Sequence, residues 1–153
     1  MSAKVSASAG SGTSARVIVA SVLYLIMSVI GTIVAVVQER PAEFLGTSTG
    51  LPALQDWLYG MGTAFSPPFY WMAVQVVFMV LAPKSGKAGT VGLLGLAIIG
   101  GTNTFGALAE PITYTVFNPA TFDPLGAAIQ VGMVILPFAM MIVAVQEWSR
   151  RRR

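Results

Sequence analysis

Four long apolar runs divide the chain, and polar or turn-forming segments separate them. Each run is continuously apolar, which favours a helix over the alternating strands of a membrane barrel. Because a helix rises about 1.5 Å per residue, about 20 residues cross a hydrocarbon core about 30 Å thick. The pattern predicts an all-α, polytopic membrane protein, a four-transmembrane-helix bundle with spans at about 17–37, 66–82, 88–109 and 125–146.

The first apolar run also resembles a secretory signal peptide, because a basic residue precedes it. Its apolar part is too long for a signal peptide, however, and no small-x-small cleavage site follows before Pro41. We therefore interpret it as an uncleaved anchor. The Ser66-Pro67-Pro68 sequence is typical of a helix start, with a hydroxyl N-cap followed by proline, and it predicts where the second span begins.

The segment between the first two spans has a helical period in its second half. Leu51, Leu54 and Leu58 recur at steps of three and four residues, and Asp56 falls on another face. This predicts a short amphipathic helix lying on the membrane interface, with a plain loop as the alternative. The later segment 110–124 is rich in proline and predicts a second loop on the same side.

The apolar pattern and the flanking composition divide the chain into three parts. Residues 1–15 are mostly Ser, Ala and Gly and predict a disordered cytoplasmic tail. Residues 16–149 form the membrane domain, and residues 150–153 form a basic cytoplasmic tail.

The positive charges predict the orientation. The chain has 9 Lys and Arg residues, and only Arg40 lies on the side of the two long loops; the other eight (9 − 1) share the opposite side. The positive-inside rule then places both termini in the cytoplasm, in a multi-pass protein of the plasma or inner membrane. The Arg-leaning, Ala/Gly/Val-rich usage suggests a bacterial source. The residues that we expect to anchor this topology, or to bind anionic lipid, are Lys84, Lys87, Arg150, Arg151, Arg152 and Arg153.

Two absent residue types exclude several functions. The chain has no Cys and no His, so it lacks a thiol nucleophile, a disulfide, and imidazole ligands for haem, zinc or copper. No His is present to activate a hydroxyl, and no charged residue lies within any predicted span. We therefore expect no enzyme activity, no metal and no cofactor. Because the cations flank the apolar runs, we expect no nucleic-acid partner either.

The third span carries small residues on one face. Ala88, Gly92, Gly95, Thr102 and Gly106 fall on this face, where they allow another helix to approach closely. We interpret it first as packing inside the bundle. The alternative is an interface with a second copy or with another membrane protein.

Three amide side chains lie within the spans, at Gln75, Asn103 and Gln130. In hydrocarbon such groups seek hydrogen-bond partners, so they could simply pair between helices. The alternative is a polar pocket open to the outside, completed by Glu110 and Tyr114, that receives a small ligand or a lipid headgroup.

Glu110 follows the end of the third span, where the helix dipole disfavours a carboxylate. Arg40 is the only cation on that side of the membrane, so we expect a Glu110–Arg40 ion pair. Pro137 lies inside the fourth span and should kink it by leaving the carbonyl of Met133 without its helical donor.

Among functions, the pattern favours a non-enzymatic accessory or interaction subunit of a membrane assembly. Its expected partners are membrane lipids and another membrane protein or a second copy of the chain. The alternative is a small uncoupled transporter, or a ligand- or lipid-binding protein that uses the polar pocket.

Overall fold

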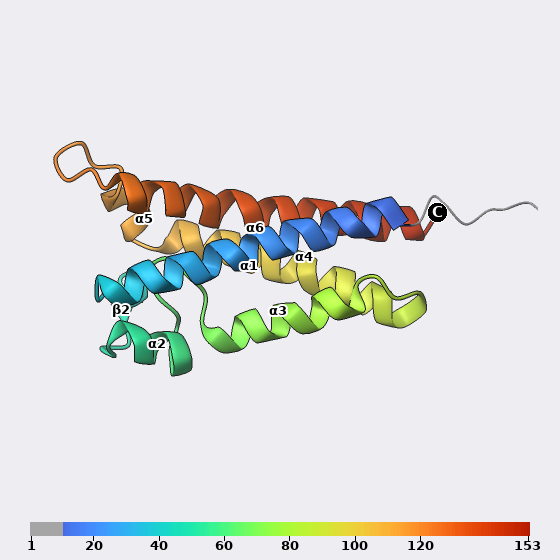
Figure 1. Cartoon of the computed structure of the whole chain (residues 1–153), viewed down its shortest axis with the longest axis horizontal. Coiled ribbons are helices and arrows are strands. Elements are labelled where there is room, and N and C mark those ends of the chain that lie inside the picture. The colour runs from blue at the N-terminus through green and yellow to red at the C-terminus, as the bar shows by residue number, and fades with distance from the viewer. Residues whose placement is uncertain (1–10) are drawn as a thin grey trace, which may run out of the picture.

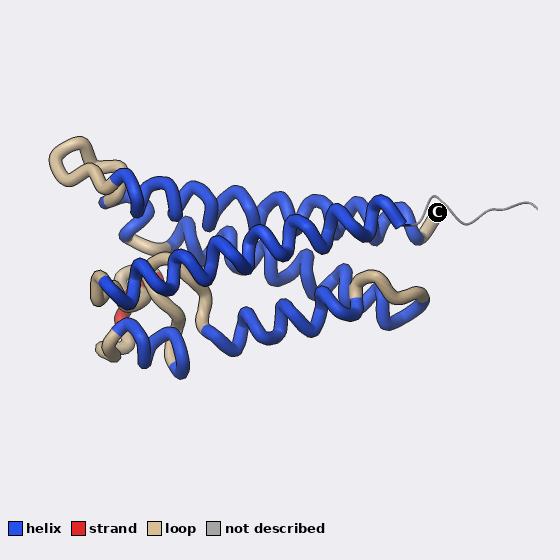
Figure 2. The backbone as a smooth tube through the Cα atoms, viewed as in Figure 1, coloured by secondary structure: helices blue, strands red, loops and turns tan. Residues whose placement is uncertain are grey.

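The computed structural model describes residues 11–153 and is mostly helical (Figure 1). Of the predicted tail at 1–15, the first ten residues lie outside the described residues, and α1 already begins at Ser11. A small antiparallel hairpin and two short helices connect the long helices (Figure 2). In chain order the elements are α1 (Ser11–Val37), β1 (Glu43–Phe44), β2 (Thr47–Ser48), α2 (Ala53–Tyr59), α3 (Phe69–Leu81), α4 (Gly86–Ala109), α5 (Ile112–Thr115) and α6 (Pro124–Arg151).

Three helices of the described chain are long and apolar enough to cross a membrane: α1 from Ala15 onward, α4 and α6. They run side by side, with α1 and α4 both packed against α6 (Figure 1). α3 packs mainly against α4 and has 13 residues, or about 20 Å of helix. That is shorter than a hydrocarbon core of about 30 Å. The structure thus confirms membrane-length helices for three of the four predicted spans.

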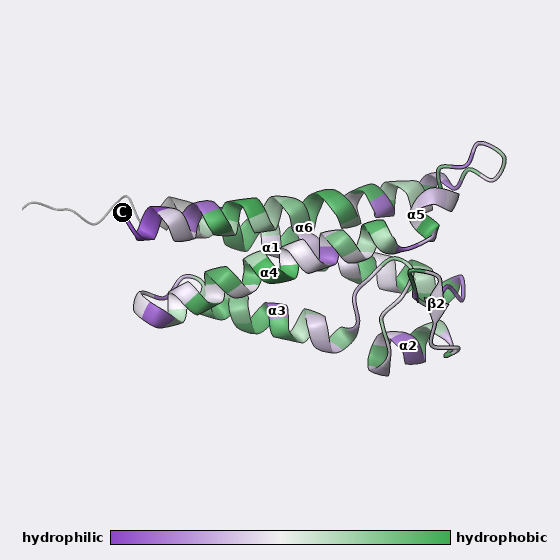
Figure 3. Cartoon of the chain, turned by 180° about the vertical axis from the view of Figure 1, so that it is seen from behind, coloured by the Kyte–Doolittle hydropathy of each residue, from purple (hydrophilic) through white to green (hydrophobic). Residues whose placement is uncertain are grey.

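The outward faces of the long helices are apolar, unlike those of a water-soluble bundle. Val19, Ile26 and Ile33 on α1 are each more than half exposed, and so are Ile98 on α4 and Ile135 on α6. Figure 3 shows hydrophobic residues along the helices and hydrophilic residues gathered at the ends of the bundle. Lipid is the solvent that such a surface requires.

The small-residue face of α4 divides between two environments. A Cβ atom at Gly92 would lie 2.3 Å from the backbone nitrogen of Ala82, and one at Gly95 would lie 2.4 Å from the ring of Phe78. These two glycines therefore let α3 and the residue after it approach α4 closely. Further along the same face, Thr102 and Gly106 pack less tightly, since a Cβ at Gly106 would meet no atom within 4 Å. Ala88, at the start of the face, is exposed.

The contact between α4 and α6 is centred on a glycine and a proline. A Cβ at Gly100 would lie 2.5 Å from the carbonyl oxygen of Pro137 and 2.9 Å from the nitrogen of Met141. Pro137 is buried within α6, and the helix continues on both sides of it. The two backbones therefore meet directly at this point, which no larger residue at Gly100 would allow.

Residues 38–66, which we call the cap, cover one end of the bundle. The β1–β2 hairpin turns at Leu45 and Gly46, both with positive φ (51° and 77°), as a tight two-residue hairpin requires. α2 lies where the short helix was expected, but Leu54 is half exposed and Asp56 is fully buried. Asp56 faces inward because its carboxylate accepts hydrogen bonds from the backbone nitrogens of Ala42 (3.0 Å) and Met61 (2.9 Å).

At the opposite end, which we call the basic end, lie the α3–α4 turn and the carboxyl terminus (Figure 1). α6 extends through the predicted basic tail as far as Arg151. Glu147 is 1% exposed and accepts hydrogen bonds from Arg151 Nε at 2.7 Å and from Arg150. Arg151 also donates to the carbonyl oxygen of Lys84 at 3.0 Å, which joins α6 to the α3–α4 turn. The guanidinium of Arg152 lies over the Trp148 ring, 4.0 Å from its centroid.

Candidate functional site

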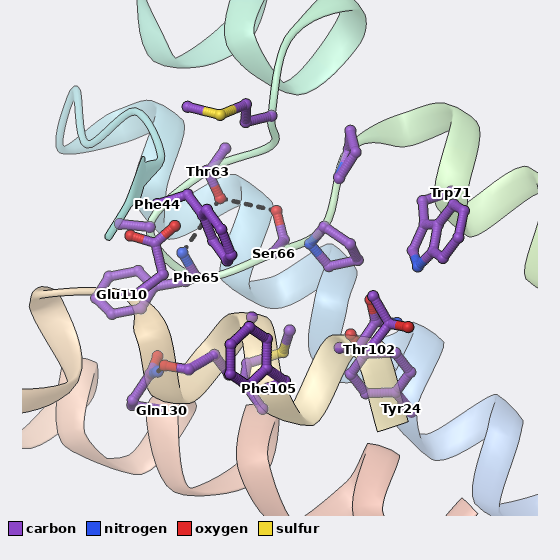
Figure 4. Close-up of a pocket in the computed structure, with 18 of the residues that line it drawn as sticks. Tyr24, Phe44, Thr63, Phe65, Ser66, Trp71, Thr102, Phe105, Glu110 and Gln130 are labelled. Carbon is purple, nitrogen blue, oxygen red and sulfur yellow. Dashed lines mark hydrogen bonds between the residues drawn. The ribbon is translucent and has the colours of Figure 1, made fainter. Parts of the chain in front are cut away.

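A cavity of about 380 Å³ lies between the first half of α3 and the second half of α4, next to the cap (Figure 4). α1 and α6 contribute a few side chains to its wall, so that every long helix takes part. The residues that line it are Tyr24, Phe44, Met61, Thr63, Ala64, Phe65, Ser66, Pro67, Pro68, Tyr70, Trp71, Thr102, Asn103, Phe105, Gly106, Ala107, Glu110, Gln130 and Met133.

Segment 61–68 forms the wall of the cavity on the cap side. The predicted N-cap, Ser66, does not start α3; the helix begins at Phe69 after an extended Pro68 (ψ 152°). The Ser66 hydroxyl instead accepts a hydrogen bond from Thr32 on α1 at 2.8 Å and lies 2.7 Å from the Thr63 hydroxyl. These contacts hold the segment on α1, so α3 begins farther along the chain than the sequence suggests.

Gly31 on α1 makes this docking possible. A Cβ atom there would lie 2.2 Å from the carbonyl oxygen of Phe65. Only a residue without a side chain lets the 61–68 segment lie so close to α1. Phe65 is then buried beside the helix, with the Arg40 guanidinium 5.7 Å from its ring centroid.

Three buried polar groups at the cavity have no hydrogen-bond partner in the described part of the chain. They are the hydroxyl of Tyr24, Nδ2 of Asn103 and Oε1 of Gln130, which come from three different helices. Of the six such atoms among residues 11–153, these three belong to residues that line the cavity. A buried polar group without a partner costs about 1–3 kcal/mol, so each of the three is unfavourable in the structure as it stands.

Gln130 is held in place by the other half of its amide. Nε2 donates to the carbonyl oxygen of Ala107 at 2.8 Å and also to the hydroxyl of Thr113. Thr113 in turn donates to Ala107. These bonds fix the orientation of the amide, and its Oε1 is buried without a hydrogen-bond partner among the described residues.

Glu110 is the only ionisable carboxyl group among the lining residues. It is 8% exposed, and its Oε2 accepts a hydrogen bond from the backbone nitrogen of Glu43 at 3.0 Å. Burial raises the pKa of Glu110 to about 7; the Glu43 hydrogen bond opposes this rise, while the charges of Glu43 and Asp56 add to it. This carboxyl therefore changes its charge near neutral pH.

The structure pairs Arg40 differently from the predicted Glu110–Arg40 ion pair. Arg40 lies 3.2 Å from Asp123, the residue that caps α6 by accepting a hydrogen bond from Gly126. Glu110 makes no ion pair with any residue in the range 11–153. The prediction was wrong because Asp123 lies at the same end of the bundle and pairs with Arg40. The backbone N–H of Glu43 donates the hydrogen bond to Glu110 instead.

Two of the residues expected in a polar pocket lie elsewhere. Gln75 is fully buried in the helix bundle, where its Nε2 donates to the carbonyl oxygen of Ser21 at 3.2 Å and to Met140. Tyr114 is 69% exposed, and its hydroxyl donates to the carbonyl oxygen of Leu108. Asn103, Gln130 and Glu110, in contrast, all line the cavity.

Aromatic side chains make up much of the remaining wall. Tyr24, Phe44, Phe65, Tyr70, Trp71 and Phe105 all line the cavity. Phe44 of the cap meets Phe105 of α4 edge to face, with 6.1 Å between ring centroids. In the view of Figure 4, Glu110 and Gln130 lie toward one end of the cavity, and Trp71 and Tyr24 lie toward the other. The site thus combines a polar end, a lone carboxyl group and several aromatic faces.

Sequence reasoning missed Tyr24, although a signal was present. Tyr24 lies between Ser21 and Ser28 at steps of three and four residues, on the stripe of α1 that is buried. An aromatic residue within this otherwise small and polar stripe had to face the interior.

The described residues contain no group of three or more acidic side chains that could hold a metal ion. No family model matches the chain, and no match is found among curated proteins or solved structures.

Proposed function

We propose that the chain is a non-enzymatic membrane protein of the cell membrane that takes an amphipathic small molecule or lipid into the cavity beside α3 and α4. The cavity itself carries this proposal, because aromatic side chains form much of its wall and Glu110, Asn103 and Gln130 are among the few polar residues that line it. An apolar cavity with a few convergent polar groups is the usual form of a small-molecule site, and about 380 Å³ is within the usual range of volumes.

The proposal includes four membrane crossings with both termini in the cytoplasm. α3 would make the second crossing together with the extended residues that precede it, since Pro67 and Pro68 lack the backbone N–H groups that hydrocarbon penalises. Lys84, Lys87 and the arginines from 150 onward all belong to the basic end, as the positive-inside rule requires for a cytoplasmic face. The cap and the cavity would then lie in the outer half.

Polar residues from three helices lie around this one cavity, with Gln130 toward one end and Tyr24 toward the other. The polar groups of an occupant would be stabilised by the dipoles of these residues, and the aromatic wall would contact its apolar part.

The test uses a variant that fills the cavity without disturbing the fold. A Cβ atom at Gly106 meets nothing within 4 Å, and Gly106 lines the cavity, so Gly106→Leu should place a side chain in the ligand's space. Ile98→Phe on the same helix, at a position that is 64% exposed, is the matched control. We expect native mass spectrometry to find a retained small molecule with the parent protein and with Ile98→Phe, but not with Gly106→Leu. Identical spectra for all three proteins would contradict the proposal.

A second candidate is the accessory or interaction subunit. It is supported by the part of the small-residue face, at Thr102 and Gly106, that α3 leaves open. An apolar side chain from a partner helix could enter the cavity there. The same spectra separate the two candidates, because a partner subunit or a second copy adds the mass of a protein rather than that of a small molecule.

A further inference from the structure

We infer that the occupant of this cavity is an amphipathic organic cation, with Glu110 as its counter-ion and the aromatic side chains as its cage. The inference rests on the proposed function, because it names the ligand class of the same cavity. It stands on three observations: the charges at this end of the molecule, the composition of the wall, and the polar groups that are buried behind the wall.

The first observation is the charge balance near the cavity. Segments 38–68 and 110–124 contain the carboxylates Glu39, Glu43, Asp56, Glu110 and Asp123 and a single cation, Arg40. Arg40 is engaged with Asp123, and the described residues that line the cavity include no Lys or Arg. The formal charge of these two segments is therefore negative, which favours cations over phosphate or carboxylate headgroups.

The second observation is that the wall suits an organic cation better than a metal ion. Glu110 is the single carboxylate of the wall, and no acidic cluster among the described residues could coordinate a metal. Six lining residues are aromatic, and an aromatic face attracts an alkylated or arylated cation placed within about 6 Å of its centroid.

The third observation comes from the buried polar groups. Tyr24 is fully buried and Gln130 is 1% exposed, and each has an oxygen atom buried behind the cavity wall without a hydrogen-bond partner among the described residues. Oxygen atoms of this kind stabilise a nearby cation through their dipoles. Glu110 also keeps acceptor capacity, because the bond from Glu43 uses only Oε2.

Protonation of Glu110 should compete with the cation. Its pKa of about 7 means that the carboxyl is largely ionised at about pH 8 and largely protonated at about pH 6. The charged groups around it are Glu43 from β1 and Asp56 from α2, while α6 presents the neutral Gln130. Cation binding should therefore weaken by about tenfold as the pH falls from about 8 to about 6, because the proton occupies the same carboxylate.

The experiment compares two ions of nearly identical shape and opposite charge, tetraphenylphosphonium and tetraphenylborate. Their affinities for the full chain in lipid nanodiscs are measured by titration calorimetry at about pH 8, and empty nanodiscs provide the background. We expect the phosphonium to bind at least about tenfold more tightly than the borate. Glu110→Gln should remove this preference and the pH dependence, because the amide keeps the shape and the Glu43 hydrogen bond but has no charge.

Glu39→Gln is the control for general electrostatics, because Glu39 is exposed at the same end and does not line the cavity. It should leave both affinities nearly unchanged. Equal affinities for the two ions, tighter borate binding, or phosphonium binding that is unaffected by both pH and Glu110→Gln would overturn the cation assignment. The proposed function is judged separately, by the small molecule retained in the parent protein and lost in Gly106→Leu.

Discussion

Glu147 and Glu110 are both buried carboxyl groups near the end of a long helix, at opposite ends of the bundle. Each meets the unfavourable end of its helix dipole. Glu147 bonds to two guanidinium groups, and one of them extends to the α3–α4 turn. Glu110 has one backbone N–H as its donor and otherwise faces a cavity. The buried carboxylate at the basic end is therefore paired with arginines, whereas Glu110 at the capped end has no ion pair among the described residues.

The same contrast runs along α4. At Gly92 the backbone at the end of α3 lies directly against α4, whereas a Cβ atom at Gly106 would meet no atom within 4 Å. α3 is therefore close to α4 near the basic end and leaves room beside it near the cap. We expect substitutions at the basic end to act on stability and substitutions at the capped end to act on binding.

The largest effect should come from placing the same side chain at these two glycines. Gly92→Leu must push apart two backbones, because its Cβ would lie 2.3 Å from a main-chain nitrogen, and it should lower the free energy of unfolding by more than about 3 kcal/mol. Gly106→Leu should leave it unchanged or raise it by about 0.5 kcal/mol, since leucine favours a helix more than glycine does. Thermal unfolding followed by circular dichroism measures both. Similar losses at the two sites would remove the distinction between the ends.

Removing the closing carboxylate should have the next largest effect. In Glu147→Ala the guanidinium groups of Arg150 and Arg151 lose their shared acceptor, and we expect a loss of about 2–3 kcal/mol. The loss is limited because the Arg150 side chain is 45% exposed and can turn toward water. The α3–α4 turn, held through Arg151 and Lys84, should also become more sensitive to protease. An unchanged unfolding temperature and unchanged cleavage would show that Glu147 does not hold this end together.

The third effect on stability should come from Glu110, and it should depend on pH. The folded protein keeps the proton up to a pKa of about 7, while the ordinary pKa of a glutamate carboxyl is 4.5. The contribution of Glu110 to stability should thus be greatest below about pH 4.5 and fall by up to about 3 kcal/mol as the pH rises through about 7. Glu110→Gln cannot ionise and should not show this fall. Parallel pH profiles for the two proteins would mean that Glu110 is not the group responsible.

Much of the fold could be predicted because lipid imposes a simple rule on the sequence. A backbone without water must satisfy its own hydrogen bonds, so long uncharged runs become helices, as they do in α1, α4 and α6. The second run was harder, because Ser66 can cap a helix or bind another hydroxyl. In the structure the Ser66 hydroxyl accepts a hydrogen bond from Thr32. Thr32 lies 34 residues away, so no local sequence pattern predicts this contact.

The site was predicted only in part, for a similar reason. Asn103 and Gln130 could be found because polar groups in apolar runs are conspicuous, and Glu110 because it directly follows the third run. The partner of Arg40 could not, since several carboxylates lie in the same loops and only their positions in space decide between them. Glu147 was missed because the predicted span ended at Gln146. The arginines three and four residues later were the signal that a salt-bridged turn of helix continues there.

The position of the cavity also determines how it would be filled. Tyr70 and Phe105, which are 51% and 60% exposed, stand at its edge on the side walls formed by α3 and α4. In the proposed membrane arrangement that edge faces acyl chains rather than water. A guest would then arrive by two-dimensional diffusion within one leaflet. Its occupancy would follow its partition coefficient, so that a compound too dilute to detect in the medium could still saturate the protein.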